Sequence, residues 1–413
     1  MSEDAAADEG AEPTPPSERI VGLDALRGFA LLGILVINIR LFSMPEIVLL
    51  NPTVYGDFSG ANYWAWFVGH VFAERKFLTL FTMLFGASLL LFTRKFDEDL
   101  TTLRLHYRRS FWLIVFGVAH AYLLWYGDIL VSYGVTAVFV VFVRDESARF
   151  LAAVGAALFV VPSVAEVLTA TYGDLSSFAA TWRPAESVLR AEVETYRGGW
   201  LEQFDHRAES AWNRQTTSYL GATAWRTAGS MMVGMALFKW GVLTNERSAR
   251  FYRLLVAVGG VVGVATLVAG VAYVEAAGWT PRAGIYWQQF IYFGAFPLAG
   301  AYVGAVMLLA RKWPRGRVTK GLAAIGRTAF SNYILQSVVA TTVFYGHGLG
   351  LFGRVTRVEA LGVVVAIWAV EVVLSVAWLR RYRYGPLEWL WRTLTYGERQ
   401  PLRRSDDASA AGD

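Results

Sequence analysis

Long apolar runs separated by short polar or basic connections dominate the chain. Each run reads as a membrane-crossing helix, because an apolar helix of about 20 residues spans the hydrocarbon core of a bilayer. The predicted spans cover residues 22–42, 76–93, 110–126, 128–143, 150–170, 219–240, 254–277, 285–310, 321–345 and 357–379. We therefore predict an all-α, polytopic membrane protein with about ten transmembrane helices in one bundle.

The polar stretches divide the chain into five parts. Residues 1–18 are acidic and rich in proline, without the apolar core of a signal peptide, and predict a disordered cytosolic tail. Residues 19–170 form an N-terminal membrane half and residues 219–398 a C-terminal one. Between them, residues 171–218 mix acids and bases and predict surface helices outside the cytosol. Residues 399–413 predict a second disordered tail.

Composition and charge agree with this organisation. Hydrophobic residues make up 55% of the chain and charged residues only 17%, too few for a soluble protein of this length. The net charge of +5 does not indicate nucleic-acid binding, because the basic residues lie between apolar spans and form no patch. They gather on one side of the predicted membrane, which places both termini in the cytosol of a multi-pass cell-membrane protein. Cysteine is absent, and we expect no metal and no bound cofactor.

Three polar residues interrupt the first apolar run. Asp24 lies one helical turn before Arg27, and Asn38 lies about three turns after it, so the three side chains share one face of the helix. Ionisable groups within a membrane helix mark a candidate functional site, since their burial in lipid is costly. The alternative is that Asp24 and Arg27 pair only to anchor the helix at the cytosolic headgroups.

Two histidines are candidate bases. His70 lies four residues before Glu74, which puts both on one helical face, and Lys76 follows closely. His120 lies within the third predicted span, eight residues before Asp128. The alternative for each is a structural hydrogen bond between helices. The other histidines are weaker candidates, because they fall in polar loops or a glycine-rich turn: His106, His206 and His347.

Further polar residues within the later spans extend the same predicted site. Asn332 and Gln336 are one turn apart in the ninth span, and Glu371 lies in the middle of the tenth. A carboxylate at that depth needs a partner, and Arg226 of the sixth span is a candidate. A purely structural pair is as consistent with this pattern as a substrate-binding one. Small residues four apart, such as Gly259 with Gly263 and Gly300 with Gly304, predict close helix packing in the seventh and eighth spans.

Several motifs carry a family resemblance over nearly the whole chain. They include LDALRGFALLGILVIN, KFLTLFTMLFGASLL, FGVAHAYLLWYGDIL, GRTAFSNYILQS and RYRYGPLEWLWRTLTYG. Together they resemble the YeiB-like family, a bacterial and archaeal domain of unknown function numbered 418, to which the C-terminal half is especially similar.

That family resembles in turn a set of transmembrane acyltransferases, which includes the lysosomal heparan-glucosaminide acetyltransferase, and the likeness lies in the N-terminal half. In the O-antigen-modifying members, a first-helix Arg is followed eleven positions later by a His taken to be catalytic. This chain has Asn38 there instead. It resembles the glucosaminide enzyme in that respect and in having a His, here His70, in the next segment.

The resemblance and the residues together predict acyl transfer from cytosolic acyl-CoA to a cell-envelope glycan or lipid acceptor. We expect catalytic roles for His120 or His70, assisted by Asp128 or Glu74. The alternative function is a transporter or flippase of a small molecule or a lipid-linked substrate, with the buried charges along its pathway. The predicted substrate-binding residues are the same for both: Asp24, Arg27, Asn38, Lys76, Arg226, Asn332, Gln336 and Glu371.

Overall fold

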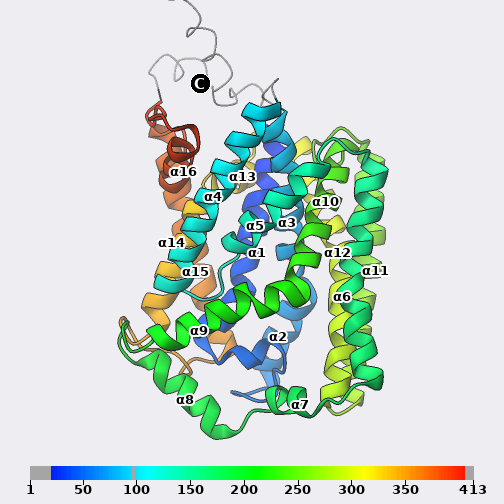
Figure 1. Cartoon of the computed structure of the whole chain (residues 1–413), viewed down its shortest axis with the longest axis vertical. Coiled ribbons are helices and arrows are strands. Elements are labelled where there is room, and N and C mark those ends of the chain that lie inside the picture. Colours follow the sequence, from blue (N-terminus) through cyan, green and yellow to red (C-terminus); the bar gives the residue numbers. More distant parts are fainter. Residues whose placement is uncertain (1–19, 95–98, 405–413) are drawn as a thin grey trace, which may run out of the picture.

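The computed structural model describes residues 20–94 and 99–404, and over these it is a bundle of helices without a β-strand (Figure 1). The predicted all-α fold class is confirmed. The tail predicted at 1–18 lies outside the described residues. Of the second tail, residues 405–413 lie outside as well, whereas Leu402 accepts a backbone hydrogen bond from Arg383. The division into two membrane halves stays a prediction.

The α-helices are numbered along the chain, with short 3-10 or π turns between some of them. Their bounds are Val21–Ser43 (α1), Gly60–Phe72 (α2), Lys76–Thr93 (α3), Asp99–Leu123 (α4), Leu130–Val140 (α5), Ala148–Tyr172 (α6), Ser176–Trp182 (α7), Glu186–Arg197 (α8), Phe204–Gln215 (α9), Ala224–Lys239 (α10), Ala249–Ala276 (α11), Pro281–Lys312 (α12), Arg317–Arg327 (α13), Ala329–Phe344 (α14), Arg357–Arg381 (α15) and Pro386–Tyr396 (α16).

The two ends of the bundle differ. Helix α16 lies at one end, here called the α16 end (Figure 1). Helices α7, α8 and α9 lie at the opposite end, called the α8 end. The surface helices predicted within residues 171–218 are therefore present, and they cover one end of the bundle.

Among the described residues, six helical stretches are both long and apolar enough to cross a membrane. The expected count of about ten is not confirmed. Helix α5 with its 3-10 extension is apolar but short, and the ninth predicted span is broken at Thr328 into α13 and α14. The six are Val21–Ser43, Gly60–Thr93, Ala148–Tyr172, Ala249–Ala276, Pro281–Lys312 and Arg357–Arg381.

Helix α1 occupies the middle of the bundle, and the helices around it expose apolar side chains. Leu26, Ala30 and Leu31 of α1 are fully buried. Val261 of α11 and Val365 of α15 are instead more than half exposed, as are many of their apolar neighbours. An apolar outer surface around a packed, partly polar interior is what a bilayer requires of a helical bundle.

Small residues allow α11 and α12 to approach closely, as predicted. A Cβ atom at Gly259 would collide with the carbonyl oxygen of Pro297, and one at Gly304 with that of Tyr252. Contact between backbones maximises van der Waals packing where lipid supplies no hydrophobic driving force. The predicted role is confirmed for Gly259 and Gly304, whereas a Cβ atom at Gly300 would meet only the side chain of Leu255.

Candidate functional site

His120 lies between a carboxylate and a hydroxyl contributed by different parts of the chain. Its Nδ1 atom is 2.9 Å from Oδ1 of Asp128, and its Nε2 atom is 2.8 Å from Oγ of Ser337 on α14. The imidazole is only 2% exposed, and the ring of Tyr333 packs on it with centroids 5.0 Å apart. The carboxylate is itself fixed, since its Oδ2 accepts a hydrogen bond from the first turn of α5 at Val131.

Local structure explains this arrangement. Helix α4 ends three residues after His120, and the chain turns through Gly127 so that Asp128 comes back beside the imidazole. A carboxylate at Nδ1 holds the proton on that nitrogen, which leaves Nε2 as an acceptor for a hydroxyl proton. The three side chains therefore have the order that activates a hydroxyl for nucleophilic attack.

The sequence predicted His120 with Asp128 and missed Ser337. The hydroxyl lies 217 positions from the imidazole, and serine is common in membrane helices. One signal was present, because Ser337 directly follows Gln336, which the sequence had already marked as a polar residue of this span.

His70 belongs to a second buried cluster, at the break between α2 and α3. Its Nδ1 atom is 3.0 Å from Oε2 of Glu74, and its ring is stacked between Trp66 and Trp287 at 5.1 and 5.0 Å. The predicted His70–Glu74 contact is thus present. The Nε2 atom of His70 is buried and has no hydrogen-bond partner among the described residues.

Two cations accompany this histidine. Lys76 donates from Nζ to the carbonyl oxygen of His70 at 2.5 Å, and Arg40 lies 3.9 Å from the Glu74 carboxylate. Arg40 also donates to the carbonyl oxygen of Trp66 at 3.1 Å. The sequence missed Arg40, since a basic residue at the end of a membrane helix usually snorkels to the headgroups. Here it is buried, at 6% exposure.

Asp24 and Arg27 form the predicted pair on α1, at 3.0 Å. Arg27 also donates to Oγ of Ser88 on α3 at 2.6 Å, which joins the pair to a neighbouring helix. Asn38 is half-buried on the same helix, and its amide has no hydrogen-bond partner among the described residues. No hydrogen bond among the described residues therefore links the Asp24–Arg27 pair or Asn38 to either histidine cluster.

The pairing expected between Arg226 and Glu371 is wrong. Arg226 forms a 2.9 Å ion pair with Glu166 of α6, and its guanidinium lies 3.4 Å from the ring centroid of Tyr292. Gln289 donates to the same carboxylate at 2.9 Å. The pair forms because α6 and α10 pack side by side, which places Glu166 beside Arg226.

Glu371 is instead held by Gln336, whose Nε2 donates to it at 3.0 Å. One turn away, Asn332 donates to the hydroxyl oxygens of Thr328 and Ser375 at 3.0 and 2.9 Å. These polar contacts join α14 to α15 inside the bundle. Gln336 precedes Ser337, so this network adjoins the His120 cluster along the backbone.

The remaining histidines differ in part from expectation. His106 lies on α4, where it is 1% exposed and hydrogen-bonded to the carbonyl oxygen of Ala137 at 3.0 Å, so its assignment to a solvated loop is wrong. His206 lies on α9, half-buried beside Tyr196. His347 lies in the glycine-rich turn after α14, as predicted.

Comparison with known proteins finds relatives that match the chain over nearly its whole length. A family model described as "Protein of unknown function (DUF418)" matches residues 237–398. The uncharacterised protein YeiB of Escherichia coli (strain K12) is 34% identical over 389 residues, which cover 92% of this chain and 96% of YeiB. The chain belongs to the YeiB-like DUF418 family.

Two further relatives extend this similarity. The uncharacterised protein YxaH of Bacillus subtilis (strain 168) is 30% identical over 95% of this chain and 98% of its own length. An uncharacterised 39.9 kDa protein encoded beside an amylase gene in Bacillus acidopullulyticus is 24% identical over 96% and 99%. All three are described as uncharacterised, so the comparisons give the family and no activity. The stretch matched by the family model contains Ser337 and Glu371 and excludes His120.

Proposed function

We propose that this protein transfers an acyl group from cytosolic acyl-CoA to a hydroxyl group of a cell-envelope glycan or lipid, with His120 as the general base. The observation that carries the proposal is the position of His120 between Asp128 and Ser337. A buried imidazole with a carboxylate on one nitrogen and a hydroxyl on the other is arranged for proton transfer.

In the proposed reaction, the acceptor hydroxyl takes the place of Ser337 as the hydrogen-bond partner of Nε2. Its proton passes to Nε2 while its oxygen attacks the thioester carbonyl of the acyl-CoA. The bond from the carbonyl carbon to sulfur then breaks, and the leaving thiolate takes the proton from His120. Asp128 keeps the proton on Nδ1 and stabilises the imidazolium that forms in between.

The donor would bind from the α16 end. Arg27 is pinned by Asp24 and Ser88, and its side chain remains 26% exposed, so it can meet a CoA phosphate. Arg109 is held more firmly, with its guanidinium 4.7 Å from the ring of Trp391 on α16. Arg109 and His120 are eleven residues apart on α4, about 16 Å along its axis, which is the distance the thioester arm has to cover.

Transport remains the second candidate, and the His70 cluster supports it. Arg40, Lys76 and Glu74 are ionisable and almost fully buried at the point where the α2–α3 helix pair is broken. Charged groups at a helix break inside a membrane bundle are typical of substrate or ion pathways. This reading needs no chemistry at His120.

The experiment that separates the two functions uses purified full-length protein in lipid nanodiscs. Acetyl-CoA is added with and without membrane extract as the source of acceptor, and free CoA is measured. Release that depends on both protein and extract supports acyl transfer. No release with acetyl or longer donors, together with solute flux in proteoliposomes, supports transport instead.

A further inference from the structure

Three tyrosines from separate elements meet at the α8 end of the bundle. Tyr126 follows α4, Tyr196 lies on α8 and Tyr345 follows α14. The ring of Tyr196 is 6.3 Å from that of Tyr126 and 4.7 Å from that of Tyr345. All three residues are at most 2% exposed, and none of their hydroxyl groups has a hydrogen-bond partner among the described residues. We call them the tyrosine cluster.

Two arginines of α9 border the tyrosine cluster and also carry unpartnered atoms. The guanidinium of Arg214 lies 4.9 Å from the ring of Tyr126, and Arg207 is an electrostatic neighbour of both Tyr196 and Tyr345. The Nε atom of Arg214 and Nη1 of Arg207 are buried without a partner. Each such group destabilises the fold when it stays unpaired. Five of them in one place indicate a site that is completed by something other than protein.

The cluster lies beside the proposed base. The ring of Trp125, next to Tyr126, is 6.3 Å from that of His120, and the indole nitrogen of Trp125 is also buried without a partner. Tyr345 follows Ser337 by eight residues, about 12 Å along α14. Tyr196 of α8 and the two arginines of α9 border the cluster, so a group held by the tyrosines would lie near His120.

We propose that the tyrosine cluster binds a polyhydroxylated ligand, the headgroup of a sugar or glycolipid. Hydroxyl groups both donate and accept, so they satisfy tyrosine hydroxyls and arginine N–H groups together, while the aromatic faces cover the C–H surface of a sugar ring. A hydrocarbon chain would leave these groups unpaired. Burial raises the pKa of Tyr196 well above that of an ordinary tyrosine, which keeps its hydroxyl neutral.

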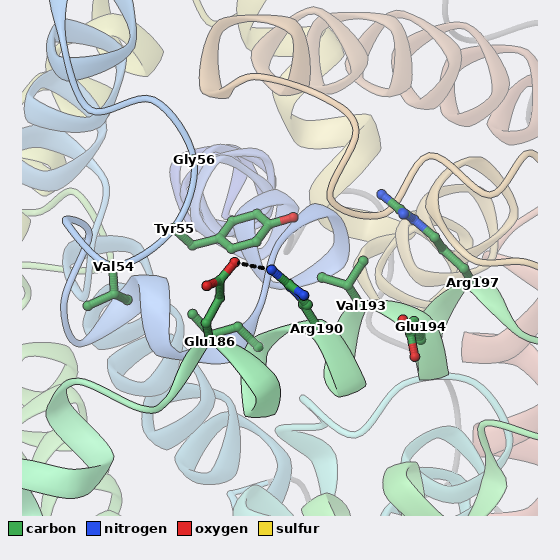
Figure 2. Close-up of a pocket in the computed structure, with 9 residues that line it drawn as sticks. Val54, Tyr55, Gly56, Glu186, Arg190, Val193, Glu194 and Arg197 are labelled. Carbon is green, nitrogen blue, oxygen red and sulfur yellow. Dashed lines mark hydrogen bonds and ion pairs between the residues drawn. The ribbon is translucent and has the colours of Figure 1, made fainter.

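A surface cavity offers an approach to this site. About 440 Å³ in volume, it lies between the turn at Val54–Gly56 and one face of α8, where Tyr55, Glu186, Arg190 and Arg197 line it (Figure 2). Val193 also lines this cavity, and it packs in the same apolar cluster as Tyr196 and Tyr345. The cavity and the tyrosine cluster therefore adjoin the same stretch of α8, where Tyr196 lies between the lining residues Val193 and Arg197. The claim that the bound sugar is the acyl acceptor rests on the proposed function. The claim that the cluster binds a sugar does not.

The test measures sugar binding without any acyl donor. Saturation-transfer NMR is recorded on full-length protein in phospholipid nanodiscs with the methyl glycosides of glucose, galactose, mannose and N-acetylglucosamine, and empty nanodiscs supply the background. We expect saturation of at least one sugar ring in the wild type. The double variant Tyr126→Phe/Tyr345→Phe should weaken that binding at least fivefold, because it removes two hydroxyls and keeps both rings.

Stability provides the second readout. The double variant should unfold at the wild-type temperature or above it, since the lost hydroxyls bond to no protein group. Tyr133→Phe is the matched control, because that hydroxyl is 2.5 Å from Oγ1 of Thr82. It should lower stability and leave sugar binding unchanged. Wild-type protein that gives no saturation above background, or a double variant that binds as well as the wild type, overturns the proposal. Loss of acyl transfer with sugar binding intact contradicts only the proposed function.

Discussion

The Nε2 atom of His120 lies 2.8 Å from Oγ of Ser337, on helix α14, which begins only at Ala329. The same imidazole contacts Asp128, eight residues further along, in the turn that follows α4. The first contact depends on how α4 packs against α14, and the second on how α4 ends. Together they orient the ring in the interior of the bundle, close to the tyrosine cluster.

Replacement of Ser337 separates two mechanisms. If the acceptor hydroxyl attacks the thioester directly, Ser337→Ala should lower kcat for acyl transfer by less than about tenfold, because His120 and Asp128 remain. Initial rates of CoA release give this value. A loss as large as that caused by replacing His120, with an acyl group found on the Ser337 peptide by mass spectrometry, would show that the serine is the nucleophile.

The ion pair of Arg226 can be tested by double-mutant cycles. We expect a coupling free energy on the order of 1 kcal/mol between Arg226→Met and Glu166→Gln, and none between Arg226→Met and Glu371→Gln. Reversible unfolding in mixed detergent micelles measures both cycles. Coupling to Glu371 alone would mean that α10 packs against a different neighbour.

Stability should depend on pH through Glu192 of α8. Burial raises the pKa of Glu192 to about 7. The hydrogen bond that its carboxylate accepts from the backbone N–H of Glu46 lowers this pKa, and the negative charge of the Glu46 side chain raises it. Folding therefore favours the protonated carboxyl. This contribution is fully present below the ordinary pKa of about 4.5 and is lost as pH rises through about 7.

Glu192→Gln should accordingly stabilise the folded protein at pH 8 by up to about 3 kcal/mol, and so raise its thermal midpoint. Near pH 4.5 the midpoint should stay unchanged. Glu194→Gln, an exposed position on the same helix, is the control and should leave the wild-type pH profile intact. A Glu192→Gln protein that loses stability at pH 8 would show that the charged form is favoured, against this account.

The orientation in the membrane is tested by cysteine labelling, since the chain has no cysteine of its own. Ser59 and Ser176 are exposed at the α8 end, and Ser147 is exposed at the other end, where α6 begins. With both termini in the cytosol, Ser59→Cys and Ser176→Cys should react with an impermeant maleimide in intact cells, whereas Ser147→Cys should react only after lysis. The reverse pattern rejects this topology.

Contacts close in the sequence were predictable, and contacts between distant helices were not. The His120–Asp128 and Asp24–Arg27 contacts follow from helical spacing and a tight turn, which a sequence displays directly. The sequence offers several carboxylates as partners for Arg226, and only the packing of α6 on α10 determines that the partner is Glu166.

The sequence also did not show which side chains at helix ends are buried. Arg40 closes the first apolar run and has the pattern of a headgroup anchor, yet Gly69 of α2 leaves room for its guanidinium inside the bundle. The tyrosine cluster has no sequence signature either, because its members come from three separate parts of the chain and each is an ordinary interface aromatic on its own. The helical class follows from apolar run lengths, but the number of spans does not, since Thr328 breaks a run that hydropathy leaves continuous.

The most direct test of the account compares His120→Gln with His70→Gln. Both proteins are purified in nanodiscs, checked for folding by gel filtration, and assayed for CoA release from acetyl-CoA in the presence of membrane extract. The account predicts that His120→Gln lowers kcat by about 10²–10⁴-fold and that His70→Gln stays within a few-fold of the wild type. Full turnover by His120→Gln would contradict it, whether His70→Gln is active or not.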